Sequence, residues 1–193
     1  ILTSLDFYGQ TAKAVAGKYG KVTAIIDRPS VDPHDYEPTV NTAKQASSAQ
    51  LIIYNGLGYD DWMEKLTVNK QAGARVINVG TSVAKKADGA NEHVWYDPTT
   101  MPKLAAKIAA DLSKIQPQHK RYFYQQARKY QASTRTITTK IKQLKQQAKG
   151  QRVAVSEPVF DYSLKAMGYH ITNNHFARAI EEGTDPSPKD IQQ

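Results

Sequence analysis

The feature that most constrains the fold is a long helical stretch between Pro117 and Lys149, which has no internal glycine or proline. Within it, apolar residues and one threonine recur at alternating spacings of four and three, which places them on one stripe of a single helix. About 32 residues at 1.5 Å per residue reach roughly 48 Å, more than the width of a small domain. We therefore expect a rigid helix that joins two lobes. The stripe consists of Phe123, Ala127, Tyr130, Thr134, Ile137, Ile141, Leu144 and Ala148.

The segment before this helix, residues 1–116, alternates short β-branched runs with helical patterns. Such alternation predicts βαβ units and a parallel sheet, and hence an α/β lobe. The expected strands are residues 1–3, 21–27, 50–54 and 75–79, and the expected helices are residues 6–16, 38–48, 60–66 and 99–115.

The segment after the helix, residues 151–193, begins again with a strand pattern at 151–156, a helix at 161–167 and a possible strand at 169–172. Ser187-Pro188-Lys189-Asp190 matches a capping box at a helix start. These residues are too few to bury a core of their own. We therefore expect three parts, namely an N-terminal α/β lobe at 1–116, a linker helix at 117–150 and a partial C-terminal α/β lobe at 151–193 that the native protein continues.

Two loops carry a histidine in the same local setting. His34 follows one predicted strand and His93 follows another, and each loop leads to a proline near a predicted helix start, with Asp97 expected as the helix N-cap. Glu157 follows the strand predicted at 151–156. Ligands of open α/β sheets bind where the carboxyl ends of strands converge, so these three side chains are candidates for one site.

Two imidazoles and a carboxylate suit Zn²⁺ or Mn²⁺, whereas the absence of cysteine excludes thiolate ligands. The competing interpretation is that these loop histidines are ordinary surface residues. His175, which follows another predicted strand, is a further possible ligand.

Charge is unevenly distributed along the chain, whose formal net charge is +8. Between Met101 and Arg152 there are thirteen Lys or Arg residues and one acid, Asp111, so the rest of the chain is net acidic. A charge run on a long helix is usually a solvated face, and the alternative is that this helix lies near an anionic membrane or cell-wall surface. Nucleic acid is disfavoured because the segment has no repeated aromatic platform or known nucleic-acid motif. A metallohydrolase is disfavoured too, because no HExxH or paired-metal pattern is present.

Four motifs in this order resemble those of the zinc/manganese-binding solute receptors of metal ABC transporters, the ZnuA-like family. They are DPHDYEP (32–38), IIYNGLGYDDWMEKL (52–66), NEHVWYDP (91–98) and SEPVFDY (156–162), and the resemblance covers essentially the whole chain. It implies two lobes joined by one helix, a single bound Zn²⁺ or Mn²⁺ as cargo, and no enzymatic activity. It also implies a permease and its ATPase as partners, and a place outside the cytoplasm as a periplasmic protein or surface lipoprotein.

The resemblance further implies that His34, His93 and Glu157 are three metal ligands, and that a fourth ligand, an Asp, lies beyond Gln193. A chain with only three ligands should bind metal weakly or not at all. The motif NEHVWYDP (91–98) departs from the family pattern, because Glu92 stands where the family has Pro and Tyr96 where it has Leu. The His/His/Glu set leans towards Mn²⁺ through its oxygen ligand, whereas the general order of affinities favours Zn²⁺, so the choice of metal stays open.

Overall fold

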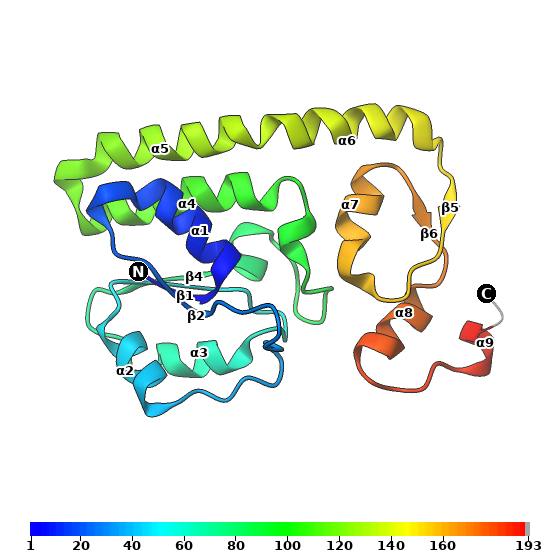
Figure 1. Cartoon of the computed structure of the whole chain (residues 1–193), viewed down its shortest axis with the longest axis horizontal. Coiled ribbons are helices and arrows are strands. Elements are labelled where there is room, and N and C mark those ends of the chain that lie inside the picture. Colours follow the sequence, from blue (N-terminus) through cyan, green and yellow to red (C-terminus); the bar gives the residue numbers. More distant parts are fainter. Residues whose placement is uncertain (192–193) are drawn as a thin grey trace. The chain divides into compact units, whose positions relative to one another are not determined.

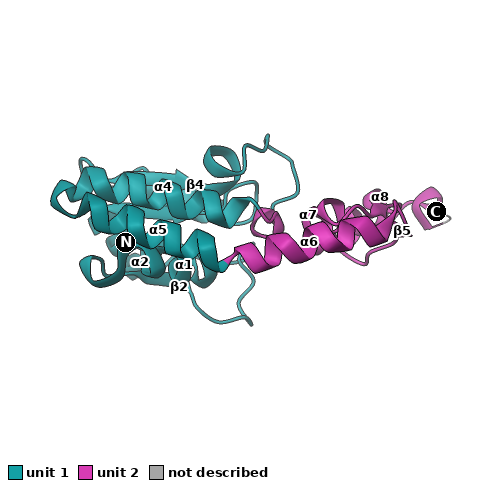
Figure 2. Cartoon of the chain, turned by 90° about the horizontal axis from the view of Figure 1, so that it is seen from above, with its two compact units in different colours: residues 1–92, 99–133 teal, residues 93–98, 134–193 magenta. Residues whose placement is uncertain are grey.

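The computed structural model describes residues 1–191, which form two compact units. Unit 1 comprises residues 1–92 and 99–133, and unit 2 comprises residues 93–98 and the chain from Thr134 onward (Figure 2). The short segment 93–98, which contains a predicted ligand, thus groups with the C-terminal part of the chain.

Unit 1 is built on a four-stranded parallel sheet with the order β2-β1-β3-β4. Every residue of β1 and β3 is buried, which explains why β3 reads as the uninterrupted apolar run LIIY. The predicted parallel α/β sheet is therefore confirmed. The strands are β1 (Leu2–Leu5), β2 (Thr23–Ile26), β3 (Leu51–Tyr54) and β4 (Arg75–Asn78).

Helices cover both faces of this sheet (Figure 1). Helices α1 (Asp6–Ala16) and α4 (Thr100–Ile115) lie on one face, with α5 (Lys120–Ser133) packed against both, and α2 (Val40–Ser48) and α3 (Asp61–Thr67) lie on the other. The core between them is closely packed and includes the fully buried side chains of Tyr8, Ile52, Met63, Leu104 and Phe123. Short turns complete the unit, at η1 (Gly17–Tyr19), η2 (Val79–Val83) and η4 (Pro117–His119).

Helix α4 begins later than predicted. Its N-cap is Thr99 rather than Asp97, because Val94–Tyr96 forms a separate 3₁₀ turn, η3, that ends with the amide of Asp97 donating to the carbonyl of Val94 (3.1 Å). Asp97 and Pro98 therefore form the connection between this turn and the helix.

The predicted long helical stretch is present, but it is interrupted once. Helix α5 ends at Ser133, Thr134 adopts a turn, and α6 runs from Arg135 to Ala148. The residues that follow the break, TITT at 136–139, are all β-branched, and such residues lose side-chain freedom in a helix. The apolar stripe also leaves Ile137 59% exposed, so little burial stabilises the helix there.

Unit 2 contains helix α6 and a two-stranded parallel sheet of β5 (Arg152–Val153) and β6 (His170–Ile171). Between the strands lie η5 (Pro158–Phe160) and α7 (Asp161–Ala166), and after them α8 (Asn174–Glu181) and α9 (Pro188–Ile191). The capping box is confirmed, because Ser187 Oγ accepts from the amide of Asp190 and the amide of Ser187 donates to the Asp190 carboxylate. No helix in residues 1–191 is long and apolar enough to cross a membrane.

Candidate metal centre

The His34 loop of unit 1 holds its histidine ring by a local contact. Asp32 Oδ1 accepts from the backbone amide of His34 and from ring atom Nδ1, each at 2.9 Å. The loop is fixed to α3 because Trp62 Nε1 donates to the carbonyl of Pro33 (2.9 Å), and the ring of Tyr59 meets His34 edge-on with centroids 4.8 Å apart. Asp32 thus sets the orientation of the imidazole and leaves Nε2 as the atom that can bind a ligand.

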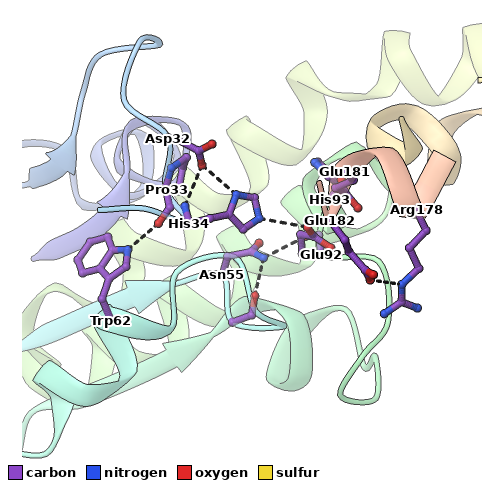
Figure 3. A network of polar contacts seen from close by, with 11 residues as sticks. Asp32, Pro33, His34, Asn55, Trp62, Glu92, His93, Arg178, Glu181 and Glu182 are labelled. Atoms are coloured by element: carbon purple, nitrogen blue, oxygen red, sulfur yellow. Dashed lines mark hydrogen bonds and ion pairs between the residues drawn. The ribbon is translucent and has the colours of Figure 1, made fainter. Parts of the chain in front are cut away.

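A second carboxylate reaches that other ring nitrogen. Glu92 Oε1 lies 3.3 Å from His34 Nε2, on a different side of the ring from Asp32 (Figure 3). Because ionised carboxylates only accept hydrogen bonds, these two contacts favour the form of the ring in which both nitrogens carry a proton. The hydrogen bond to Glu92, followed by the contacts with Asp32, raises the pKa of His34 from 6.5 to about 9. The reciprocal hydrogen bonds from His34 lower the pKa of the Asp32 carboxyl.

A buried network after β3 supports the backbone of Glu92. The amide of Asn55, a fully buried residue, donates through Nδ2 to the carbonyl of Glu92 (3.0 Å), and Asn55 Oδ1 accepts from the hydroxyl of Tyr8. Asp60 closes the same loop by accepting from the backbone amides of Asn55 (2.8 Å) and Gly56 (2.7 Å). Burial raises the pKa of Asp60, against the lowering effect of the hydrogen bonds that it accepts. The motif IIYNGLGYDDW thus forms β3 and a hydrogen-bonded loop that supports the backbone of Glu92.

Gly56 is required in that loop by its backbone and by its surroundings. Its φ is +73°, and a Cβ at this position would collide with the side-chain amide of Asn78. A side chain would therefore be both strained and obstructed.

His93 lies in unit 2, where it is 5% exposed. Its Nδ1 is 3.4 Å from Glu181 Oε1 of α8, and the ring of Trp95 lies beside it with centroids 5.0 Å apart. The turn that follows His93 is anchored to α7, because Ser163 Oγ donates to the carbonyl of Tyr96 (2.6 Å). Glu181 was missed by the sequence analysis because helix α8 was not predicted there. Its signal was the apolar spacing of Phe176, Ala177 and Ile180, which gives the short helix one apolar side.

Glu157 also lies in unit 2, at the residue just before η5. Its side chain is exposed, and within residues 1–191 its carboxylate has no hydrogen bond or ion pair. His175 is exposed on α8. The structure thus gives His34 and His93 each a carboxylate partner, Asp32 and Glu181 respectively, that can orient the ring. The grouping of His34, His93 and Glu157 into one ligand set stays a prediction.

The donors at the His34 loop fit a divalent transition metal. An imidazole whose Nδ1–H is bound by a carboxylate presents Nε2 in a fixed direction, which is the usual arrangement of a metal-binding histidine. Imidazole nitrogen and carboxylate oxygen are ligands of Zn²⁺ and, with more oxygen, of Mn²⁺.

Comparison with known proteins agrees with this chemistry. Among proteins of assigned function, the chain is similar to the manganese-binding lipoprotein MntA of Halalkalibacterium halodurans, at 26% identity over 190 residues, which is 95% of this chain and 63% of that protein. It is also similar to the iron-binding protein YfeA of Yersinia pestis, at 24% identity over 177 residues, which is 88% of this chain and 57% of that protein. The chain therefore spans about 60% of the length of these relatives.

Solved structures share the fold. The periplasmic zinc-binding protein TroA from Treponema pallidum aligns with a TM-score of 0.77 at 22% identity, over 99% of this chain and 70% of that one. The Mn-bound periplasmic metal-binding protein from Candidatus Liberibacter asiaticus aligns with a TM-score of 0.79 at 21% identity, over 99% of this chain and 72% of that one. The family of the zinc-uptake complex component A, periplasmic, matches residues 1–193. The chain belongs to this ZnuA family of metal ABC transporter substrate-binding proteins.

Proposed function

We propose that this chain is part of a substrate-binding component that captures a divalent transition metal outside the cytoplasm and delivers it to an ABC transporter permease with its ATPase. Family membership supports this function, and so do the names of relatives that bind manganese, iron or zinc. The observation that carries it is the His34 ring, whose Nδ1 lies 2.9 Å from Asp32 Oδ1, so that Nε2 is the ring atom left for a metal. The protein acts by binding and release, and no enzymatic step is part of the proposal.

The proposed ligands are His34, His93 and Glu157, with Zn²⁺ or Mn²⁺ as the cargo. Both histidines have a carboxylate on Nδ1, which supports a shared role, since a ligating imidazole usually donates its other N–H to such a group. The exposed Glu157 is available to an incoming ion, and it supplies the oxygen ligand that Mn²⁺ prefers.

Metal titration of the metal-free protein tests this function. Mn²⁺ and Zn²⁺ binding would be measured for the wild type and for His34→Ala, His93→Ala and Glu157→Ala, with His170→Ala as a control histidine that is exposed on β6. We expect the three ligand variants to lose affinity by about 10-fold or more, and the control to bind like the wild type. Wild-type affinity in the two histidine variants would refute the proposal, and turnover of hydrolysable substrates with bound metal would favour a metallohydrolase instead.

We also propose that the protein works at the outer face of a cytoplasmic membrane, as a periplasmic protein or as a lipoprotein, and that its basic helix lies near an anionic surface. Relatives whose names include "lipoprotein" or "periplasmic" support this location. The N-terminal part of α5 borders a groove of about 590 Å³ whose cations, Lys120, Arg121 and Arg128, form no ion pair with any acid in residues 1–191. Binding to liposomes should increase with their content of anionic lipid and decrease with salt. Binding that ignores both would exclude this surface role.

A further inference from the structure

Glu92 occupies the position from which a ligand to a His34-bound metal would act. Its Oε1 is 3.3 Å from His34 Nε2, the ring atom that Asp32 leaves available. Metal–nitrogen and metal–oxygen distances of about 2.0–2.2 Å place two adjacent ligand atoms of one ion roughly 3.0–3.4 Å apart. The spacing of these two atoms in the structure therefore suits a shared divalent ion as well as it suits a hydrogen bond.

The backbone of Glu92 is held by the interior of unit 1. Its backbone carbonyl accepts from Nδ2 of the fully buried Asn55, which is itself held by Tyr8 and Asp60. The Glu92 side chain is only 14% exposed, compared with 61% for Asp32. A carboxylate that is so shielded from water is stabilised by a positively charged partner, and in the structure the His34 ring lies in that place.

We propose that Glu92 is a metal ligand in this chain, beside His34 of the same unit, and that it shifts the preferred cargo towards Mn²⁺. This inference rests on the function proposed above, and it specifies Mn²⁺ as the preferred metal of the same site. In the first loop the residue directly before the histidine is Pro33, which offers no ligand atom, whereas in the second loop the same place is taken by Glu92. A second carboxylate favours a metal that prefers oxygen ligands over one that is well served by imidazole.

Without metal, the same carboxylate binds the His34 ring directly. The contact seen in the structure is then the metal-free form of the pair, in which a proton on Nε2 lies between the nitrogen and the oxygen. A bound divalent ion would take the place of that proton, which would be released to solvent, and His34 Nε2 and Glu92 Oε1 would hold the ion. Pre-organisation of this kind reduces the cost of assembling the site.

The test compares Glu92→Gln with Glu37→Gln. The first replacement keeps the size of the side chain and a hydrogen-bond acceptor, and the second removes the same charge from an exposed residue of the His34 loop. Mn²⁺ affinity would be measured by electron paramagnetic resonance of the free ion, and Zn²⁺ affinity by displacement of bound Mn²⁺. We expect Glu92→Gln to weaken Mn²⁺ binding by about 10-fold or more and Zn²⁺ binding by less, and Glu37→Gln to match the wild type.

A spectroscopic readout separates ligation from a general charge effect. With ¹³C-labelled glutamate, Zn²⁺ should shift the carboxyl resonances of the two proposed glutamate ligands, Glu92 and Glu157, and the Glu92 resonance should be missing in Glu92→Gln. Wild-type affinities in Glu92→Gln, or an unshifted Glu92 carboxyl while metal binding still depends on His34 and His93, would overturn this inference and leave the proposed function standing. If the wild type binds neither metal when it is tested as part of the whole substrate-binding component, both proposals are overturned.

Discussion

Replacing Glu92 by glutamine should lower the pKa of His34 from about 9 towards that of a free imidazole. In the metal-free protein the hydrogen bond to Glu92 is the largest cause of the raised value of about 9, and the contacts with Asp32 come next. Glutamine keeps an acceptor but loses the charge, so the remaining shift should be the smaller one that Asp32 maintains. Replacement of Asp32 by asparagine should lower the pKa of His34 by less.

The size of the effect on stability follows from the geometry. A change from 6.5 to about 9 would correspond to roughly 3 kcal/mol if the ring were fully buried. Because 40% of the His34 side chain is exposed, screening by solvent reduces the contribution to about 1 kcal/mol. A raised histidine pKa stabilises the fold fully below pH 6.5, and this stabilisation is lost as the pH rises through about 9.

The assay is a pH titration of the ¹⁵N-labelled imidazole by NMR after removal of metal by a chelator, with urea unfolding at pH 6 and pH 10. Glu37→Gln is the matched control, since it removes one negative charge from the same loop. We expect the control to titrate like the wild type and Glu92→Gln to titrate at clearly lower pH. A wild-type His34 that titrates near 6.5, or one that Glu92→Gln leaves unchanged, would refute the reasoning.

Three further predictions concern the framework of unit 1. Asp111→Ala should destabilise the unit by about 3 kcal/mol in urea unfolding, because the carboxylate is 1% exposed and pairs with an arginine and a lysine; a loss below about 0.5 kcal/mol would contradict the role of this ion pair. Phe123→Ala should cost about 3–4 kcal/mol because its ring is fully buried, whereas Tyr124→Ala, at an exposed neighbour, should change stability by less than about 0.5 kcal/mol. Asp60→Ala should speed hydrogen exchange at the amide of Gly56 by about 10-fold or more, since the amide loses its buried acceptor; unchanged exchange would show that another group holds the loop.

The elements of unit 1 were predictable because their signals are local. The span of helix α1 matches its prediction, since an acidic residue opens it and Gly17 ends it with a φ of +51°. Strand β3 was recognised as an apolar run between polar residues, and parallel pairing followed from the alternation of strands and helices. Neither inference required knowledge of distant contacts.

Two features were missed, one because opposing effects act on the same helix and one because the element depends on contacts with residues far along the chain. The pause at Thr134 arises where β-branched residues and an exposed stripe weaken a helix that periodicity alone predicts to be continuous. Helix α8 is short, and it was missed together with Glu181, the partner of His93. Such elements depend on packing against the rest of their unit more than on propensity.

The two histidine loops show why the candidate site could be only half predicted. The first reads Asp32-Pro33-His34, and the carboxylate two residues before the histidine binds its ring, a contact that sequence separation alone permits. The second reads Asn91-Glu92-His93, so its carboxylate lies one residue closer to the histidine, at the place that Pro33 takes in the first loop. Its contact is with His34, 58 residues away, and this follows only once Asn55 has fixed the backbone of Glu92. The carboxylate thus stands two residues before the histidine in the first loop and one residue before it in the second. In the first loop Asp32 binds the ring of its own loop, whereas in the second loop Glu92 reaches Nε2 of His34, the atom through which that imidazole would bind a metal.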